Sequence, residues 1–359
     1  MTQREAQILR WIQEDPLISQ QELADRAGIA RSSVAVHISN LMKKGCIEGK
    51  GYIVRTAPYV VVVGGIRVDI GGRPHRGLDP HTVNAGQIRT SLGGAGRNIA
   101  HDLRQLGVDV RMITALAEDV YARRIHHSCT ALGIDLSHSV KVPEAVTASR
   151  VYITDAQGHP ELAVSDREIL DHITPEWLSA HQYLLDGAQL VVMDADLPEA
   201  SIQWLARHVR VPLYADPADL SRAELLKPVL GRLHTVKTSL AEAQLLSSVA
   251  IHDRASLDQA ADVLLSTGLK RLLITLGPHG IYAADQTECC LLPPSQGVTV
   301  STNGCGDAAV AGMVWAHLEG CTLEESVRAA RAAAAITRES PHTISPDLTP
   351  DFLRQLTFS

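Results

Sequence analysis

The spacing of apolar residues changes near residue 57. Before that point apolar positions recur every three to four residues, which predicts three short helices. Their apolar faces are Ile8, Leu9 and Ile12, then Leu23, Ala24 and Ala27, then Val34, Ile38, Leu41 and Met42. Ser19 and Glu22 form a helix-start signature, Gly28 supplies a turn, and residues 46–54 predict two short strands around a glycine turn. This pattern predicts a separate N-terminal module of residues 1–56.

Beyond residue 57, continuous apolar runs alternate with helical patterns. Strands are expected over 59–63, 110–114, 190–194, 211–216, 234–237 and 271–276, and helices over 97–106, 121–132, 199–208, 257–266 and 307–318. This alternation predicts an α/β domain of residues 57–359, with helices covering a mainly parallel sheet. Residues 66–92 and 140–166 break the alternation, and we expect them to form a small antiparallel lid. Ligands of such sheets bind at the carboxyl ends of the strands.

Composition narrows the class of protein further. Only 4% of the 359 residues are aromatic against 45% hydrophobic, so the cores must consist mainly of Ala, Val, Leu and Ile. A net charge of −7 argues against a protein that coats nucleic acid with its whole surface. The six cysteines form no CxxC pair, the N-terminus lacks the apolar core of a signal peptide, and no apolar run is long enough to span a bilayer. We therefore expect a cytoplasmic protein with no membrane association.

Histidines are numerous, and a metal site is one use for them. His126 and His127 are adjacent within a predicted helix, where neighbouring side chains face different directions. The sequence therefore predicts no metal site at this pair.

The third predicted helix of the N-terminal module has the features of a DNA-recognition helix. The segments 19–24 and 29–34 resemble the winged helix-turn-helix family, in which the first residues of the third helix meet base edges. The resemblance implies DNA contacts from Arg31, Ser32, Ser33, His37 and, in the wing, Lys50. Residues 30–55 hold five basic residues against one acid, Glu48, which suits phosphate contact. A helical docking module is the alternative; paired half-sites would require a homodimer.

Two glycine-containing segments carry the candidate chemistry. Residues 301–307 read STNGCGD and precede a small apolar run that predicts a helix. The amides of Gly304, Cys305 and Gly306 can bind a phosphoryl group at the helix N-terminus, and Asp307 can accept the proton of an attacking hydroxyl. A helix-capping role for Asp307 is the alternative. The second segment, 91–98, opens another predicted helix, in which Asn98 offers a donor and an acceptor to a sugar hydroxyl.

Together these segments resemble the two signature regions of the ribokinase-like (PfkB) family of carbohydrate and nucleoside kinases, over residues 59–340. The resemblance implies a ribokinase-like αβα sandwich with a small β lid, and ATP and Mg²⁺ as cofactors. It implies that Asp307 is the catalytic base beside the anion hole of Gly304–Gly306. The substrate contacts that it implies are Asp69, Gly93, Gly94 and Asn98. ATP contacts are expected from Lys237, Glu242, Thr275, Gly277, Gly280 and Thr302, with Glu242 also organising Mg²⁺ through water.

Two positions depart from that family's pattern. Ser301 stands where the family usually has an Asp linked to an activating K⁺ site, and Ser239 stands where an Asn usually precedes Glu242 by three residues. Dependence on K⁺ is therefore an open question, whereas the expected base and anion hole are kept.

The fused winged helix and the segments 162–166, 173–175 and 194–198 resemble the pseudouridine-kinase-like branch of the family, although Asp196 replaces a common Asn. This resemblance implies conversion of pseudouridine to pseudouridine 5′-phosphate, with Asp166 as a further substrate contact. The alternative for Asp166 is a loop acid before a helix. The alternatives for the whole chain are a kinase for another nucleoside or a sugar, and a transcription regulator whose kinase-like domain senses a ligand.

Overall fold

The computed structural model describes residues 1–47, 58–157 and 160–358. By its internal contacts the chain separates into two compact units, Met1–Pro58 and Tyr59–Ser359. No helix within the described ranges combines the length and the apolar character that a membrane span needs.

The first unit is built from three helices around a small apolar core. These are α1 (Gln3–Glu14), α2 (Gln20–Ala27) and α3 (Arg31–Lys43), and all three were expected. Ser19 and Glu22 form the expected capping box, in which each side chain accepts the backbone N–H of the other residue. Gly28, with φ of 62°, ends α2 in the left-handed conformation that a glycine adopts readily. The strands expected over 46–54 fall largely on residues 48–57, outside the described residues.

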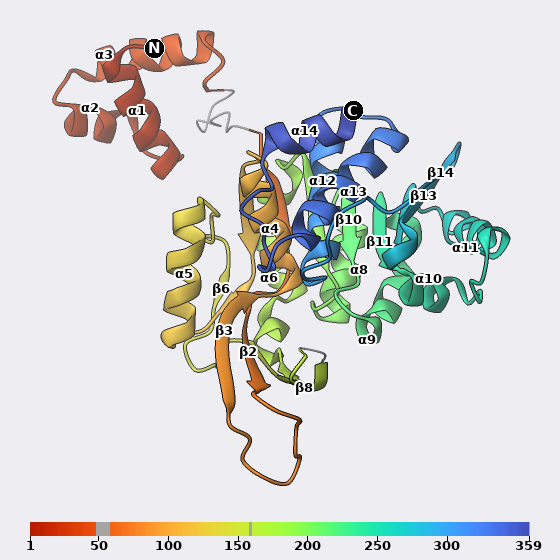
Figure 1. Cartoon of the computed structure of the whole chain (residues 1–359). Coiled ribbons are helices and arrows are strands. Elements are labelled where there is room, and N and C mark those ends of the chain that lie inside the picture. The colour runs from red at the N-terminus through yellow and green to blue at the C-terminus, as the bar shows by residue number, and fades with distance from the viewer. Residues whose placement is uncertain (48–57, 158–159, 359) are drawn as a thin grey trace. The chain divides into compact units, whose positions relative to one another are not determined.

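The second unit contains an eight-stranded sheet in the order β14-β13-β12-β11-β10-β9-β1-β4 (Figure 1). Its parallel strands are β1 (Val60–Val63), β4 (Val110–Ile113), β9 (Leu190–Asp194), β10 (Leu213–Asp216), β11 (Thr235–Ser239) and β12 (Arg271–Thr275). The prediction of a mainly parallel sheet is confirmed. The antiparallel strands β13 (Ile281–Asp285) and β14 (Cys289–Leu292) extend one edge and were not expected.

Helices cover both faces of this sheet, which is why its strands read as unbroken apolar runs. Val60 and Val62 face a core shared with α4 (Ala95–Gln105), α12 (Cys305–Leu318), α13 (Leu323–Arg338) and α14 (Pro350–Phe358). Val61 and Val63 face a core shared with α6 (Pro175–Ala180), α7 (Gln182–Asp186), α8 (Glu199–His208), α10 (Leu240–Ser247) and α11 (Arg254–Ser266). The remaining elements are α5 (Val120–Leu132), β5 (Ala115–Leu116), β6 (Val140–Lys141), α9 (Leu220–Ala223), and the short 3₁₀ helices Glu168–His172, Glu224–Arg232 and Gly277–His279.

A second sheet of four strands forms the lid, in the order β3-β2-β7-β8. Its strands are β2 (Arg67–Pro74), β3 (Gly86–Gly93), β7 (Ser149–Thr154) and β8 (Pro160–Asp166), and the β2–β3 hairpin extends away from the helical layers (Figure 1). The expectation of an antiparallel lid is only partly right, because β2 pairs with β7 in parallel. Between β3 and β7 the chain passes through α4, β4 and α5, and it returns to the lid in the direction of β2.

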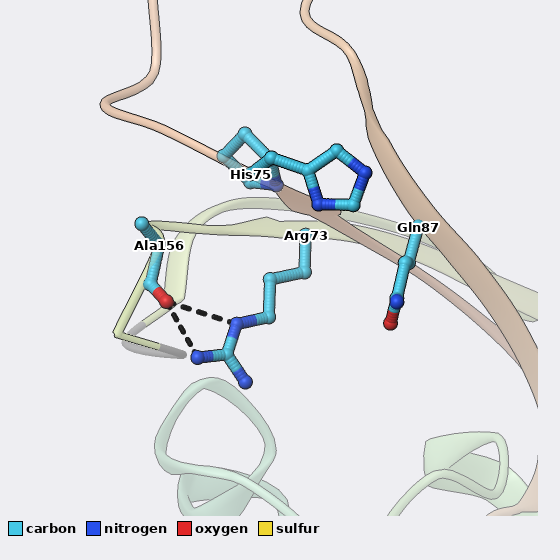
Figure 2. A pocket seen from close by; sticks show the side chains of 5 residues that line it. Arg73, His75, Gln87 and Ala156 are labelled. Atoms are coloured by element: carbon cyan, nitrogen blue, oxygen red, sulfur yellow. Dashed lines mark hydrogen bonds between the residues drawn. The ribbon is translucent and has the colours of Figure 1, made fainter.

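The two faces of the lid sheet differ in polarity. The register Ser91–Asp69–Arg150–Ser165 places four polar side chains on one face. The opposite face carries an exposed apolar group, the apolar lid face, consisting of Ile88, Val151, Leu162 and Val164. At the free end of the lid, Arg73 donates to the carbonyl of Ala156 across a hollow that Gln87 also lines (Figure 2). This contact ties β2 to the turn that follows β7.

Candidate active site

Asp307 and Asn98 meet where the N-terminal turns of α12 and α4 lie together. Asn98 Nδ2 donates to Asp307 Oδ2 at 2.8 Å, and Asn98 is 6% exposed. Burial raises the pKa of Asp307 to about 7, with the negative charge of Asp216 adding to the rise while Lys237 and Asn98 oppose it. A carboxylate that titrates near neutral pH is well matched to accept the proton of a hydroxyl group. Asn98 Oδ1 is buried and has no hydrogen-bond partner within the described residues, so its capacity to accept a hydrogen bond is unused.

The turn before Asp307 presents backbone N–H groups rather than side chains. Gly304 is the N-cap of α12 with φ of 83°, and no side chain caps the first turn. A Cβ on Gly304 would overlap the carbonyl oxygen of Thr343, and a Cβ on Gly306 would lie 2.9 Å from Lys237 Nζ. Gly304 is therefore required by its backbone neighbour, whereas a Cβ on Gly306 would meet only the end of the Lys237 side chain. The N–H groups of this helix terminus suit an anion, although that of Cys305 already donates to the carbonyl of Thr302 at 3.3 Å. Thr302 is exposed at the edge of the turn.

Lys237 provides a buried positive charge beside this turn. Its Nζ lies 2.8 Å from Asp216 Oδ2, and the two side chains are 12% and 3% exposed. Burial lowers the pKa of Lys237, but the negative charges of Asp216 and Glu242 outweigh that effect, so its pKa lies above its usual value. Lys237 is on β11 and Asp216 ends β10, its parallel neighbour, which places the pair at the carboxyl edge of the sheet.

Glu242 lies in the first turn of α10, the helix that directly follows the strand carrying Lys237. Its Oε2 accepts the backbone N–H of Ser239 at 2.7 Å, and the Ser239 hydroxyl accepts the N–H of Glu242 in return. Ser239, which replaces the expected Asn, therefore acts as the helix cap. Glu242 is 8% exposed, so a carboxylate faces the Lys237 region with one oxygen already engaged.

The segment around Thr275 lies at the same edge, at the end of β12. Thr275 Oγ1 donates to the carbonyl of Thr238 at 3.2 Å, which joins β12 to β11. Gly277 and Gly280 have φ of 58° and 97°, and a Cβ on Gly280 would overlap the carbonyl of Leu292. These glycines permit the tight turn from β12 into β13, next to the strand that carries Lys237.

Asp69 occupies the polar face of the lid and is 9% exposed. Its Oδ1 accepts from Arg67 Nε at 3.0 Å and from Arg150 Nε at 2.9 Å. Its Oδ2 lies over Gly93, where any Cβ would overlap it. Gly94, with φ of 101°, approaches the carbonyl of Gly65 so closely that it also admits no side chain. The glycines of the segment 91–98 thus allow the lid strands to meet the N-terminus of α4.

The structure places Asp166 away from this group. Asp166 pairs in register with Ser149, and Ser149 with Val68, so Asp166 shares the face opposite to Asp69. It is exposed and accepts the backbone N–H of Glu168 at 3.1 Å, as a loop acid before a helix does. Ser165, one position earlier, instead lines a pocket on the Asp69 side. The sequence could not show which face of the strand Asp166 occupies, because successive strand residues point in opposite directions.

Sequence reasoning missed the charged network around that pocket. Arg167 donates to Asp196 Oδ1 at 2.5 Å, and Arg67 lies 3.7 Å from Asp196 Oδ2. The pocket is lined by Gly65, Ile66, Arg67, Gly94, Ala148, Ser165, Arg167, Leu170 and Asp196. The sequence did show acids at the end of β9, but nothing in it indicated which arginines would pair with them.

Asp194, at the same strand end, organises the site through the backbone. Its Oδ2 accepts the N–H groups of Gly65 and Gly96 at 2.8 and 2.9 Å, which fixes the end of β1 against the start of α4. Burial and the neighbouring charge of Asp196 raise the pKa of Asp194 to about 7. Because α4 carries Asn98, Asp194 helps to set the position from which Asn98 reaches Asp307.

In the N-terminal unit, the first turn of α3 is open to solvent. Arg31, Ser32 and Ser33 are exposed and His37 is half-buried. The N-cap, Ala30, provides no side-chain hydrogen bond, so the N–H groups of Arg31 and Ser32 remain available to an anion, whereas that of Ser33 donates to the carbonyl of Ala30. Lys50 lies outside the described residues.

A site that combines an anion-binding helix terminus, a buried lysine, a near-neutral carboxylate and a polar lid defines a sugar or nucleoside kinase. Residues 57–350 match the pfkB family of carbohydrate kinases, and residues 1–48 match a winged helix-turn-helix DNA-binding family. The chain belongs to the pfkB family of carbohydrate kinases and carries a winged helix at its N-terminus.

Relatives support the same class. The chain is 34% identical over 353 residues to an Escherichia coli (strain K12) protein described as "Uncharacterized sugar kinase YeiI", covering 98% of each chain. It is 29% identical over 298 residues to the pseudouridine kinase of the same organism, covering 82% of this chain and 95% of that one. In fold it is similar to Arabidopsis thaliana ribokinase complexed with ribose and ATP, with a TM-score of 0.76, 22% identity, and coverage of 85% of this chain and all of that chain.

Proposed function

We propose that the kinase domain transfers the γ-phosphoryl group of ATP to the 5′-hydroxyl of a nucleoside, with pseudouridine as the preferred substrate. The observation that carries the proposal is the contact between Asn98 and Asp307 at the helix terminus formed by Gly304–Gly306. It joins a proton acceptor, a sugar-binding amide and an anion site in one place. The similarity to a pseudouridine kinase over 82% of the chain supports the choice of substrate.

The proposed reaction begins with the sugar held between the lid and α4. Asp69 accepts from ribose hydroxyls, and Asn98 Oδ1 accepts a further hydroxyl while its Nδ2 remains on Asp307. Asp307 removes the proton of the 5′-hydroxyl as that oxygen attacks the γ-phosphorus atom. The N–H group of Gly306 and the charge of Lys237 stabilise the negative charge on the phosphoryl oxygens, joined by the N–H of Cys305 once it leaves the carbonyl of Thr302. The proton resides on Asp307 at the end of the transfer.

The residues at the carboxyl edge of the sheet fit ATP with Mg²⁺. Among the described residues no three His, Cys, Asp or Glu side chains are arranged to hold a metal ion by themselves. That agrees with Mg²⁺, which commonly keeps several waters and binds through one or two carboxylates and the phosphates. We assign the binding of its water ligands to Glu242, one oxygen of which accepts from the N–H of Ser239. Bound Mg²⁺ neutralises phosphate charge. Thr275, Gly277, Gly280 and Thr302 are assigned to the nucleotide side.

The nucleobase is assigned to the side of the lid that carries Arg167 and Asp196; the pocket there measures only about 10 Å³ in this structure, so a base enters it only after the lid moves. The Arg167–Asp196 pair offers donors and an acceptor side by side, which matches the alternating carbonyl and N–H groups of a uracil edge. Arg67 bridges the two regions, because it contacts both Asp69 and Asp196. One connected set of charged side chains would thus contact both the base and the ribose.

The decisive experiment is a substrate screen with the full chain, ATP and Mg²⁺. Pseudouridine, uridine, purine nucleosides and free ribose are compared by ADP release and by mass spectrometry of the product. We expect the highest kcat/KM with pseudouridine and a 5′-phosphomonoester product. Preference for ribose or another nucleoside would overturn the substrate assignment. Turnover of none of them, with ligand binding intact, would favour the ligand-sensing regulator.

For the N-terminal unit we propose DNA binding by a homodimer. The exposed Arg31, Ser32 and Ser33 at the open end of α3 support base and phosphate contacts, with His37 and Lys50 adding to them. The apolar lid face supports the dimer, because Ile88, Leu162 and Val164 are each more than 60% exposed there. A gel-shift titration at rising salt, together with sedimentation analysis, tests both parts.

A further inference from the structure

Arg338, the last residue of α13, fixes a positive charge on the loop that leads to the anion-binding turn. Its Nη2 donates to the carbonyl oxygens of Ser295 and Gln296 at 3.1 and 3.4 Å. The side chain is 19% exposed and lies 3.8 Å from Glu339 Oε1. Two consecutive backbone carbonyls therefore converge on a guanidinium group, which stays charged in proteins.

The backbone of the same residue holds the next part of the loop. The carbonyl of Arg338 accepts the N–H groups of Val300 and Ser301 at 2.9 and 3.1 Å. Ser301 continues this order into the turn, since its hydroxyl accepts the N–H of Asn303 at 3.2 Å. Arg338 thus contacts both ends of the 295–301 segment, immediately before Gly304–Gly306.

Packing around the guanidinium leaves little room for change. Gly297 has φ of 136°, and a Cβ there would lie 3.1 Å from Arg338 Nη2 and would overlap the carboxylate of Glu339. The charge of Arg338 also reaches the turn itself: burial raises the pKa of the Cys305 thiol to about 11, and the charge of Arg338 opposes that rise. The guanidinium is therefore part of the electrostatic surroundings of the anion hole.

The donor set of this region does not fit the K⁺ ion that the resemblance to ribokinase-like proteins suggested. A monovalent cation needs several free oxygen ligands, yet the carbonyls of Ser295 and Gln296 already accept from Arg338. Ser301 offers a neutral hydroxyl in place of the carboxylate that the resemblance led us to expect there. The guanidinium charge disfavours a second cation close to it, an effect that the carboxylate of Glu339 at 3.8 Å partly offsets.

We propose that Arg338 is a positioning residue that supplies, from within the chain, the positive charge that orders the anion-binding turn, so that this kinase works without K⁺. The inference rests on the proposed kinase function. A guanidinium suits the task because its planar donors hold several carbonyls in a fixed geometry, which a mobile ion achieves only when bound.

The test compares K⁺ with choline at equal ionic strength, using two readouts. Wild-type turnover and the rise in unfolding temperature caused by a non-hydrolysable ATP analogue with Mg²⁺ should be the same in both salts. Arg338→Gln should lose kcat by about tenfold or more and regain part of it with methylguanidinium or K⁺. Arg328→Gln, with the same charge change on an exposed face of α13, is the matched control and should respond to neither cation.

Three results would overturn the inference: wild type that needs K⁺, Arg338→Gln that behaves like Arg328→Gln, or a loss of activity that neither cation restores. If Arg338→Gln does not fold, Arg338→Lys and the wild-type salt comparison decide, because the lysine keeps the charge and should keep independence from K⁺. If no substrate is turned over, the kinase proposal fails by itself. The shift in unfolding temperature then still decides whether nucleotide binding depends on K⁺.

Discussion

The side-chain amide of Asn98 donates a 2.8 Å hydrogen bond to the carboxylate of Asp307, 209 residues further along the chain. The bond fixes the amide so that Oδ1 faces away from Asp307, buried and unpartnered among the described residues. One side chain thus connects the proposed base with the proposed sugar site, and the two can be tested together.

Removing this donor should change the pH dependence of the reaction. Asp307 must be deprotonated to act as a base, so kcat/KM should rise with pH up to about 7 and then level off. The bond from Asn98 lowers the pKa of Asp307, so Asn98→Ala should move the rising limb to higher pH, by about one unit. Profiles of kcat/KM for both proteins check this, and a limb that stays in place contradicts it.

Asp307→Asn should abolish most of the turnover without removing the substrate. The amide keeps the shape of the side chain but accepts no proton, so kcat should fall by about 10²- to 10⁴-fold. Calorimetry should give a similar Kd for the nucleoside. Wild-type turnover in this variant would exclude Asp307 as the base.

Substitutions of the two lid acids, Asp69 and Asp166, should have different effects on KM. Asp69→Ala leaves Arg67 and Arg150 without their shared acceptor, so KM for the nucleoside should rise by about tenfold or more. Asp166→Ala, on the opposite face of the sheet, should leave KM unchanged, whereas Ser165→Ala should raise it moderately. Equal effects of Asp69→Ala and Asp166→Ala would show that the face assignment is wrong.

The apolar lid face should hold the homodimer together. Val164→Asp places a charge among Ile88, Val151 and Leu162, and its burial in an interface is costly, so the variant should sediment as a monomer. Val263→Asp on α11 is the control, because this valine is exposed outside the lid. A wild-type monomer at all concentrations would contradict the proposed dimer.

Arg31→Ala should weaken DNA binding and flatten its salt dependence. Loss of one phosphate contact lowers the slope of log K against log salt by about one. Arg10→Ala removes a similar exposed charge from α1 and should leave binding almost unchanged. If wild type shifts no DNA at low salt, the docking alternative for this unit is favoured.

Local patterns in the sequence predicted much of the fold. Helix periodicity and the Ser19–Glu22 box predicted α1–α3, and the β-branched runs predicted six parallel strands with their helices. These features depend on residues close together in the chain, where propensity and capping act directly. The edge strands β13 and β14 were missed, because their short segments carry no comparable periodicity.

The chemistry of the two glycine segments could also be predicted from the sequence, because an acid that follows a glycine turn indicates a helix N-terminus that binds an anion. Only the tertiary structure placed Asp216 on Lys237, Arg150 on Asp69, and Arg338 on the loop before Ser301. The structure also places Asp166 on the face opposite to Asp69, because neighbouring residues on a strand point to opposite faces. These pairings join distant segments through strand register and helix packing, and no local pattern in the chain encodes them.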